Sequence, residues 1–544
     1  MKRSFSSLML WVGAMMAAGG IAKGGVIVAG PGDAGLRAAI QTAQTGDTVV
    51  LPAPVELTSF IRIDKRLTIR PDSSSSGTVM IKGSFAGEMF QIAADGIAFE
   101  QVVFEGSPQT DGLRTEKELA LRDCSLQHLR QPLVDNFETA APHVIRLERV
   151  TVTLNDEGLL CGNLEAVNST FSWNGLYGAS TQNAFLDGCT FEHNEGSGFA
   201  LVYGTVKNCT FRFNKDLGLF FEPDPGFLYL SSSLFQANEG GGLLVGEEAV
   251  ATVDNCTFTL HNGPPAVMVR EPHEALFRHC TVVGNTYVAP GGLPGYPNGG
   301  AFAIGMAERV ELQNCLVADN PQNNAPHAAG IAGVWTDGGG NVMGVSARLG
   351  TLAANGGPTL TLLPQPGSPA INAGHLSDLL VDARGLSRLA GTAPDAGAVE
   401  TGASAPADHD ADGLPDLWEA FHGLNSNNPA DSLFDSDGDG RNALAEFNAR
   451  TDPADPKSVF RLEEIGFTGG AVPPAAVSLQ WNFVPGLMYE VQSSEDLLQW
   501  HNVAGTIRPA GRENGRLKLQ FETDVAPSRT FYRVVSKDDP FATP

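Results

Sequence analysis

Two short acidic segments have the spacing of a calcium-binding loop. The first covers residues 408–419 and the second 435–446, and in both a glycine stands at the sixth position. Alternating carboxylates turn towards one point, and Ca²⁺ takes six to eight oxygen ligands. The expected ligands are Asp408, Asp410, Asp412, Asp416 and Glu419 in the first loop, Asp435, Asp437, Asp439 and Glu446 in the second, and Leu414 and Arg441 at the seventh positions. The sequence therefore predicts Ca²⁺ as a cofactor.

The alternative for this region is a solvated acidic linker. Apolar residues argue against it, because Trp418 and Phe421 lie around the end of the first loop, and Leu444 and Phe447 lie in and after the second. A solvated linker would not need such apolar residues, because it has no core for them to pack in. Calcium binding remains the better prediction.

A second group of residues could carry acid and base chemistry. Three predicted strands at 218–221, 242–245 and 266–269 are each followed by charged loops. The candidate catalytic residues are Glu222, Asp224, Arg270, Glu271 and His273, with Glu247 and Glu248 between them. A polysaccharide lyase needs a base and a neutralising cation or acid, and a hydrolase needs two carboxylates. The alternative is an ordinary solvated loop edge. The insert 286–300, with Tyr287 and Tyr296, could wall a groove beside it.

These loops belong to an internal repeat. The pattern Asn-Cys-Thr-Phe, or a close variant, is followed shortly by another asparagine. Its Cys or Ser position falls at 169, 189, 209, 233, 256 and 280, at intervals of 20 to 24 residues. A unit of this length cannot bury its apolar side chains alone, whereas stacked copies can. The repeat predicts a solenoid of parallel sheets with turns about 4.8 Å apart.

Residues at the same position of successive repeats should lie above one another and form a ladder inside or along this solenoid. The phenylalanines 171, 191, 211, 235 and 258 should stack, and the asparagines 174, 194, 214, 238, 262, 285 and 320 should form an amide ladder. Six of the seven cysteines share one register, so we expect buried free thiols rather than disulfides. Glycines after the ladder suit a left-handed turn.

The opening helix at 36–40, the first strand at 46–51 and the repeats resemble the pectate-lyase-like family of right-handed parallel β-helix proteins, over residues 25–345. Residues 368–400, with Asp382, Arg384 and Asp395, resemble the terminal segment of exported "choice-of-anchor" proteins. This resemblance implies that the segment caps the end of the solenoid and that the three charged residues form a structural cluster rather than a catalytic one. The acidic loops resemble thrombospondin-type-3 and dockerin-like calcium repeats.

The whole chain divides into four parts on this evidence. We expect a signal peptide at 1–22, a β-helix with its terminal cap at 23–402, a calcium-binding segment at 403–458 and a C-terminal β-sandwich at 459–544. Strands are expected at 477–481, 489–493, 517–521 and 531–535, with Trp481 and Trp500 in the core. The fold class is therefore all-β.

The net charge and the predicted export limit the functions that this protein could have. With 61 acidic and 35 basic residues the net charge is −26, which disfavours nucleic acid as a partner. No apolar run after the signal is long enough to span a membrane. We expect a secreted or cell-surface protein that contacts an extracellular polysaccharide as an adhesion module. A lyase or hydrolase on the outer face is the alternative, and a passive stalk is the third hypothesis.

Overall fold

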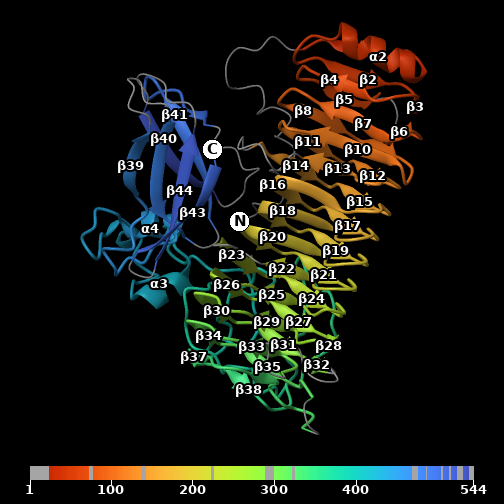
Figure 1. Ribbon diagram of the computed structural model, residues 1–544. Helices are drawn as coiled ribbons and strands as arrows, with labels where there is room; N and C mark the ends of the chain where they lie inside the picture. The colour runs from red at the N-terminus through yellow and green to blue at the C-terminus, as the bar shows by residue number, and fades with distance from the viewer. Residues whose placement is uncertain are drawn as a thin grey trace.

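The computed structural model describes residues 24–72, 77–135, 143–221, 226–287, 299–321, 325–468, 476–484, 487–503, 506–513, 516–523 and 531–537. The main body is a parallel β-solenoid that fills the right side of Figure 1, and the C-terminal domain lies along its flank. The predicted all-β fold class is thus confirmed.

One wall of the solenoid is a parallel sheet with one strand from each turn, thirteen in all. Its strands are β3 (Val55–Leu57), β6 (Val79–Gly83), β9 (Val102–Glu105), β12 (Ser125–Gln127), β15 (Thr151–Thr153), β17 (Thr170–Ser172), β19 (Thr190–Glu192), β21 (Thr210–Arg212), β24 (Leu234–Gln236), β27 (Thr257–Thr259), β31 (Thr281–Val283), β35 (Leu316–Ala318) and β38 (Val342–Met343).

The remaining walls form one continuous 23-stranded sheet, because in β16, β18 and β20 two strands of a turn merge into one. Its strands are β1 (Val26–Val28), β2 (Thr48–Leu51), β4 (Ile61–Ile63), β5 (Thr68–Pro71), β7 (Gly87–Ile92), β8 (Ile97–Glu100), β10 (Thr110–Thr115), β11 (Leu119–Arg122), β13 (Leu133–Asp135), β14 (Ile145–Glu148), β16 (Leu159–Val167), β18 (Ala179–Asp187), β20 (Phe199–Lys207), β22 (Leu219–Phe221), β23 (Gly226–Ser231), β25 (Leu243–Val245), β26 (Ala249–Asp254), β29 (Val267–Val269), β30 (Glu274–Arg278), β33 (Phe302–Ile304), β34 (Val310–Gln313), β36 (Ile331–Ala332) and β37 (Thr336–Asp337). The short strands β28 (Asn262–Gly263) and β32 (Thr286–Tyr287) pair beside it.

The first end of the solenoid is closed by helix α2 (Gly32–Thr42), at the top of Figure 1. Leu36, Ala39 and Ile40 are its buried residues, at the place where a capping helix was predicted. Their i, i+3, i+4 spacing puts one apolar stripe against the first turn. The helix thereby covers apolar side chains that have no preceding turn to pack on.

The predicted phenylalanine stack fills the interior. Rings 171, 191, 211, 235 and 258 follow one another at centroid distances of 4.6, 5.1, 4.8 and 4.6 Å and are nearly parallel. All five are fully buried. The seven cysteines are buried and free, as expected for the six that share one register, and Cys161 outside that register is free as well.

The amide ladder is also present, with one corrected position. Asn174 donates through Nδ2 to Oδ1 of Asn194 at 3.1 Å, and Asn194 donates likewise to Asn214 at 2.9 Å. In the turn that contains Phe258 the ladder residue is His261, and the prediction of Asn262 was wrong. Asn262 is exposed and lies in β28.

The predicted left-handed glycine is present after Asn238, where Gly241 has a φ of 107°, whereas the corresponding glycines of neighbouring turns have a different role. Gly196 and Gly218 do not adopt left-handed angles; a Cβ on Gly196 would lie 1.9 Å from the Leu176 oxygen, and one on Gly218 would lie 2.7 Å from the Gly242 oxygen. Close approach between turns therefore requires these glycines. In these neighbouring turns the left-handed positions fall instead on residues that precede the Cys or Asn ladders, such as Asn208 and Trp173.

The segment after the last turns lies along the side of the solenoid. It crosses back over earlier turns: Thr359 donates to the Ser232 oxygen, and Arg388 contacts Asn255. Asp382 pairs with Arg384 at 2.8 Å and is completely buried. The ion pair between Asp382 and Arg384 thus holds loops of this segment together.

The C-terminal domain is a β-sandwich of two antiparallel sheets. One sheet has the order β39 (Leu462–Thr468), β40 (Ala476–Asn482), β44 (Arg516–Thr523), β43 (Thr506–Glu513), and the other β42 (His501–Asn502), β41 (Met488–Ser494), β45 (Phe531–Lys537). Trp481 is fully buried in the core, as predicted. Trp500 instead packs against the Arg533 guanidinium at 4.3 Å.

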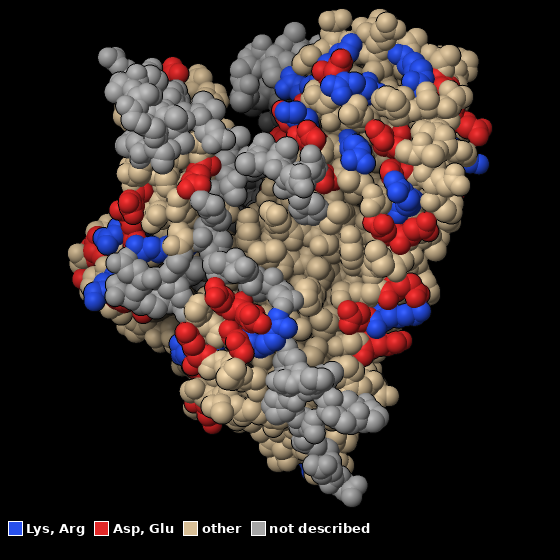
Figure 2. Space-filling view, viewed as in Figure 1, with Lys and Arg blue, Asp and Glu red and all other residues tan. Residues whose placement is uncertain are grey.

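The sandwich packs on the outer face of the 23-stranded sheet. Tyr203 and Phe227 point outward from β20 and β23 and join the buried cluster that contains Leu479 and Trp481. The rings of Phe227 and Phe483 are 4.3 Å apart. Figure 2 shows an uncharged surface over the middle turns beside this contact. None of the helices in the described ranges is long and apolar enough to cross a membrane.

Candidate calcium centre

Each acidic loop is followed directly by a short helix. Helix α3 (Asp416–His422) continues the first loop, α4 (Ala443–Ala449) continues the second, and the 3₁₀ turn η2 (Asp431–Leu433) lies between them. Asn442 caps α4, because its side chain accepts a hydrogen bond from the Ala445 N–H at 2.9 Å. Leu414, Trp418 and Ala443 form a shared apolar core. The helices therefore hold the two loops against each other.

Three carboxylates of the first loop converge. One oxygen from each of Asp408, Asp410 and Asp412 lies within 4.8 Å of the others. Both oxygens of Asp410 and one of Asp412 are buried and accept no hydrogen bond. An unpaired buried carboxylate is costly, so this arrangement calls for a bound cation.

A residue outside both predicted loops completes this group. Asp431 lies with Asp412 and Glu419 in a second set of oxygens within 4.8 Å. Glu419 is fully buried and neither of its oxygens has a hydrogen-bond partner. Oδ2 of Asp431 accepts from the Asn425 N–H at 2.9 Å, whereas Oδ1 has no partner. Sequence reasoning missed Asp431 because it lies twelve residues after Glu419, beyond any loop pattern.

The second loop repeats the arrangement. Asp435, Asp437 and Asp439 converge within 4.8 Å, and Asp437 and Asp439 each keep one buried oxygen without a partner. Asp435 accepts from the N–H groups of Gly438 at 2.8 Å and Gly440 at 2.9 Å, which bends the loop around it. Glu446 is fully buried, and its Oε2 is also unpartnered.

The electrostatics of both groups agree with this geometry. Burial, together with Asp410, Asp412 and Asp431, raises the pKa of Glu419 to about 7. Burial, together with Asp437 and Asp439, does the same for the pKa of Glu446. Carboxylates that repel one another in a buried place are stabilised by a divalent cation, and these residues fit Ca²⁺ by their oxygen chemistry.

One predicted ligand, Asp416, is placed differently, whereas ligation by the seventh loop positions, Leu414 and Arg441, stays a prediction. Oδ1 of Asp416 accepts from the His409 N–H at 2.7 Å, and Asp416 belongs to none of the converging groups among the described residues. The Leu414 side chain is in the apolar core, and its N–H donates to Asp412. The Arg441 N–H donates to Asp439 at 2.7 Å. Their backbone donors shape the loops.

The predicted catalytic group is only partly visible. Glu222 and Asp224 lie outside the described residues. Arg270 pairs with Glu247 of the neighbouring turn at 3.2 Å, and His273 pairs with Glu308 of the next turn at 3.2 Å. Glu271 is exposed, with a left-handed backbone at φ 48°. Arg270 and His273 therefore form ion pairs between turns, and a pair of converging catalytic carboxylates is not seen among the described members.

The comparisons with known proteins concern the β-helix. The family model described as "Right handed beta helix region" matches residues 149–258. The structure of pectate lyase Pel9A is 12% identical, with a TM-score of 0.34, over 70% of this chain and 97% of that chain. The AlgE4 A-module, a mannuronan C-5 epimerase of Azotobacter vinelandii, is 13% identical, with a TM-score of 0.34, over 52% and 87%.

The comparison with curated proteins gives no match. At these identities the similarity to the two solved structures concerns the fold alone. The family match over residues 149–258 and the observed parallel strand order describe the body of this chain as a right-handed parallel β-helix.

Proposed function

We propose that this chain is an exported β-helix protein that contacts extracellular glycans, and that two Ca²⁺ ions brace the segment between the β-helix and the C-terminal domain. The first ion would be held by Asp408, Asp410, Asp412, Glu419 and Asp431, and the second by Asp435, Asp437, Asp439 and Glu446. Both ions are structural in this proposal.

The observation that carries the calcium proposal is the burial of carboxylate oxygens without partners. Glu419 and Glu446 are each fully buried, each at the twelfth position of a loop, and each faces further carboxylates. A solvated acidic linker would leave these groups in water. A hard divalent cation supplies the missing partner for all of them.

Calcium titration of the whole chain by isothermal calorimetry tests this proposal. We expect two bound ions per chain and a higher thermal midpoint with Ca²⁺. The double variant Asp412→Ala with Asp439→Ala should lose the calcium-dependent part of the stability. An equal loss in chelator would argue that these residues stabilise the fold without any ion.

The glycan part of the proposal is supported by the architecture. A parallel β-helix presents long outer faces with side chains in register from turn to turn, which suits a linear polymer of repeating units. Arg270 and His273 form ion pairs between turns at that edge, and the product-release measurement below separates contact from catalysis there.

Pull-down on insoluble polysaccharides, with product release measured in the same samples, separates the functions. Retention on at least one glycan without new reducing or unsaturated ends is the expected result. Release of such ends, abolished in Arg270→Ala and Glu271→Ala, would instead establish the lyase or hydrolase alternative. The absence of retention on every glycan would contradict the proposal.

A further inference from the structure

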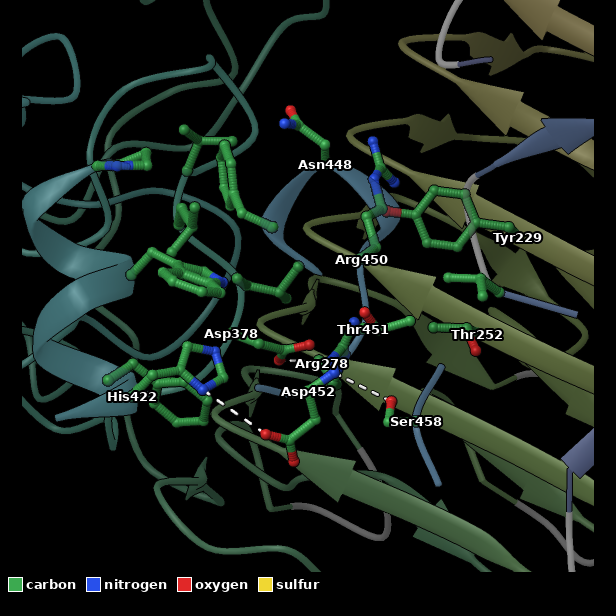
Figure 3. A pocket seen from close by; sticks show the side chains of 18 of the residues that line it. Tyr229, Thr252, Arg278, Asp378, His422, Asn448, Arg450, Thr451, Asp452 and Ser458 are labelled. Atoms are coloured by element: carbon green, nitrogen blue, oxygen red, sulfur yellow. Dashed lines mark hydrogen bonds and ion pairs between the residues drawn. The ribbon is translucent and has the colours of Figure 1, made fainter. Parts of the chain in front are cut away.

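A cleft of about 750 Å³ opens where the three parts of the chain meet (Figure 3). The outer face of the 23-stranded sheet contributes Tyr229, Thr252 and Arg278, and the segment along the solenoid contributes Asp378. The remaining walls come from helix α3, from the end of α4 and from Val484 of the sandwich. Clefts of this size at domain junctions are common ligand sites.

The apolar part of the cleft comes from the helices of the calcium segment. Trp418 and Phe421 on α3 and Phe447 on α4 line it, and Phe421 is 40% exposed. Aromatic rings that remain accessible beside polar groups suit ligands with both C–H and O–H faces. A pyranose ring is such a ligand.

The polar part is close to charge balance. The half-buried Arg278 guanidinium pairs with Asp254 at 2.7 Å and with Asp378 at 2.7 Å. His422 lies 3.7 Å from Asp452, whose N–H donates to Ser458 Oγ at 2.9 Å. Among the residues that line the cleft, the two arginines Arg278 and Arg450 are matched by the two carboxylates of Asp378 and Asp452. An anionic ligand has no excess positive charge to bind here.

We propose that this cleft binds a neutral oligosaccharide. The proposal rests on the glycan-contacting function above and names the place and the class of glycan. Thr252 contributes a hydroxyl and Asn448 an amide oxygen that can bond to sugar hydroxyls, while Phe421 offers the apolar face. The Thr451 hydroxyl donates to the Glu446 oxygen and the Asn448 Nδ2 to the Leu444 oxygen, so these two groups shape the wall of the cleft.

Calcium supports this site through the helices. Helix α3 contains Glu419, and α4 contains Glu446, so each helix carries both a cleft wall and a carboxylate of a calcium group. Without the ions the repelling carboxylates should loosen both helices. Oligosaccharide affinity is therefore expected to fall at least tenfold in chelator.

Calorimetric titration of the full chain with gluco-, xylo- and manno-oligosaccharides of three to four units tests the proposal. The main variant is Phe421→Ala, at an exposed position; a second, Thr252→Trp, fills the cleft and is checked for an unchanged thermal midpoint. The matched control is Phe531→Ala, which is 48% exposed in β45 of the sandwich and does not line the cleft. Binding should weaken at least tenfold in the first two and remain in the control.

The outcomes separate this inference from the proposed function. If both cleft variants bind oligosaccharide as the unchanged protein does, the cleft is not the binding site, although the proposed contact with glycans would still hold. Binding of oligogalacturonate but of no neutral oligosaccharide would overturn the charge argument. If the protein is retained on no polysaccharide at all, the proposed function itself fails. Equal oligosaccharide affinity in calcium and in chelator would contradict the inference that calcium stabilises the cleft through helices α3 and α4.

Discussion

At the scale of single residues, His261 is the exception in a ladder of asparagines. It is fully buried, and burial lowers its pKa to about 4. Asn238 Nδ2 lies 3.5 Å from Nε2, and Nδ1 lies 3.0 Å from Asn285 Oδ1. These partners fit a neutral ring that accepts at Nε2 and donates at Nδ1. Protonation would place a donor against the Asn238 amide.

The ladder histidine should make stability depend on pH. Its folded pKa lies below the unfolded value near 6.5, so its contribution is full above pH 6.5 and is lost as pH falls towards 4. The loss attributable to this residue is at most about 3 kcal/mol. His261→Asn restores the ladder residue type. The difference between the urea midpoints at pH 7 and pH 4 should therefore become smaller in this variant. An unchanged difference between these pH values would show that the ring does not titrate as inferred.

Asp431 is the residue-scale test of the first calcium group. Asp431→Asn keeps an oxygen for the Asn425 N–H but removes one charge from beside Glu419. The rise in thermal midpoint caused by Ca²⁺ should shrink, while stability in chelator should stay equal or increase because repulsion is relieved. Asp455→Asn, in the same segment but outside the converging groups, is the control. A full calcium response in Asp431→Asn would remove this residue from the site.

At the scale of elements, the repeat made most of the β-helix predictable. Phe191 and Phe211 could be placed in one stack because their spacing and surroundings recur. The irregular path of residues 344–402 could not be predicted, because loops held by groups such as Asp382 and Arg384 have no period. Asp431 was missed for a related reason: its partner Glu419 is a tertiary neighbour, and local spacing carries no information about it.

The phenylalanine stack should dominate the stability of the middle turns. Phe211→Ala would open a cavity between two parallel rings, at a cost of about 3–5 kcal/mol. Phe213, two residues away, is 38% exposed, so Phe213→Ala should cost well under half as much. Urea unfolding followed by circular dichroism compares the two. Similar shifts in the two variants would contradict an interior stack as the source of stability.

At the scale of the whole molecule, the sandwich and the β-helix share one apolar cluster. Tyr203 and Phe227 point outward from the solenoid, where an isolated β-helix would expose them. The run Phe227-Leu228-Tyr229-Leu230 is continuously apolar, which is typical of a strand covered on both sides, but the sequence could not show that the sandwich covers its outer side. The contact turns a chain of separate domains into a body with a defined cleft between its parts.

This contact should depend on the ring of Phe483. Phe483→Ser would remove the partner of Phe227 at 4.3 Å and weaken docking by about 1.5–3 kcal/mol. Because the calcium segment still tethers the sandwich, we expect a larger radius of gyration in small-angle scattering with both domains folded. Phe531→Ser, on the exposed side of β45, should leave the radius unchanged. The same radius in both variants would mean that docking rests on the calcium segment rather than on the Phe227 contact.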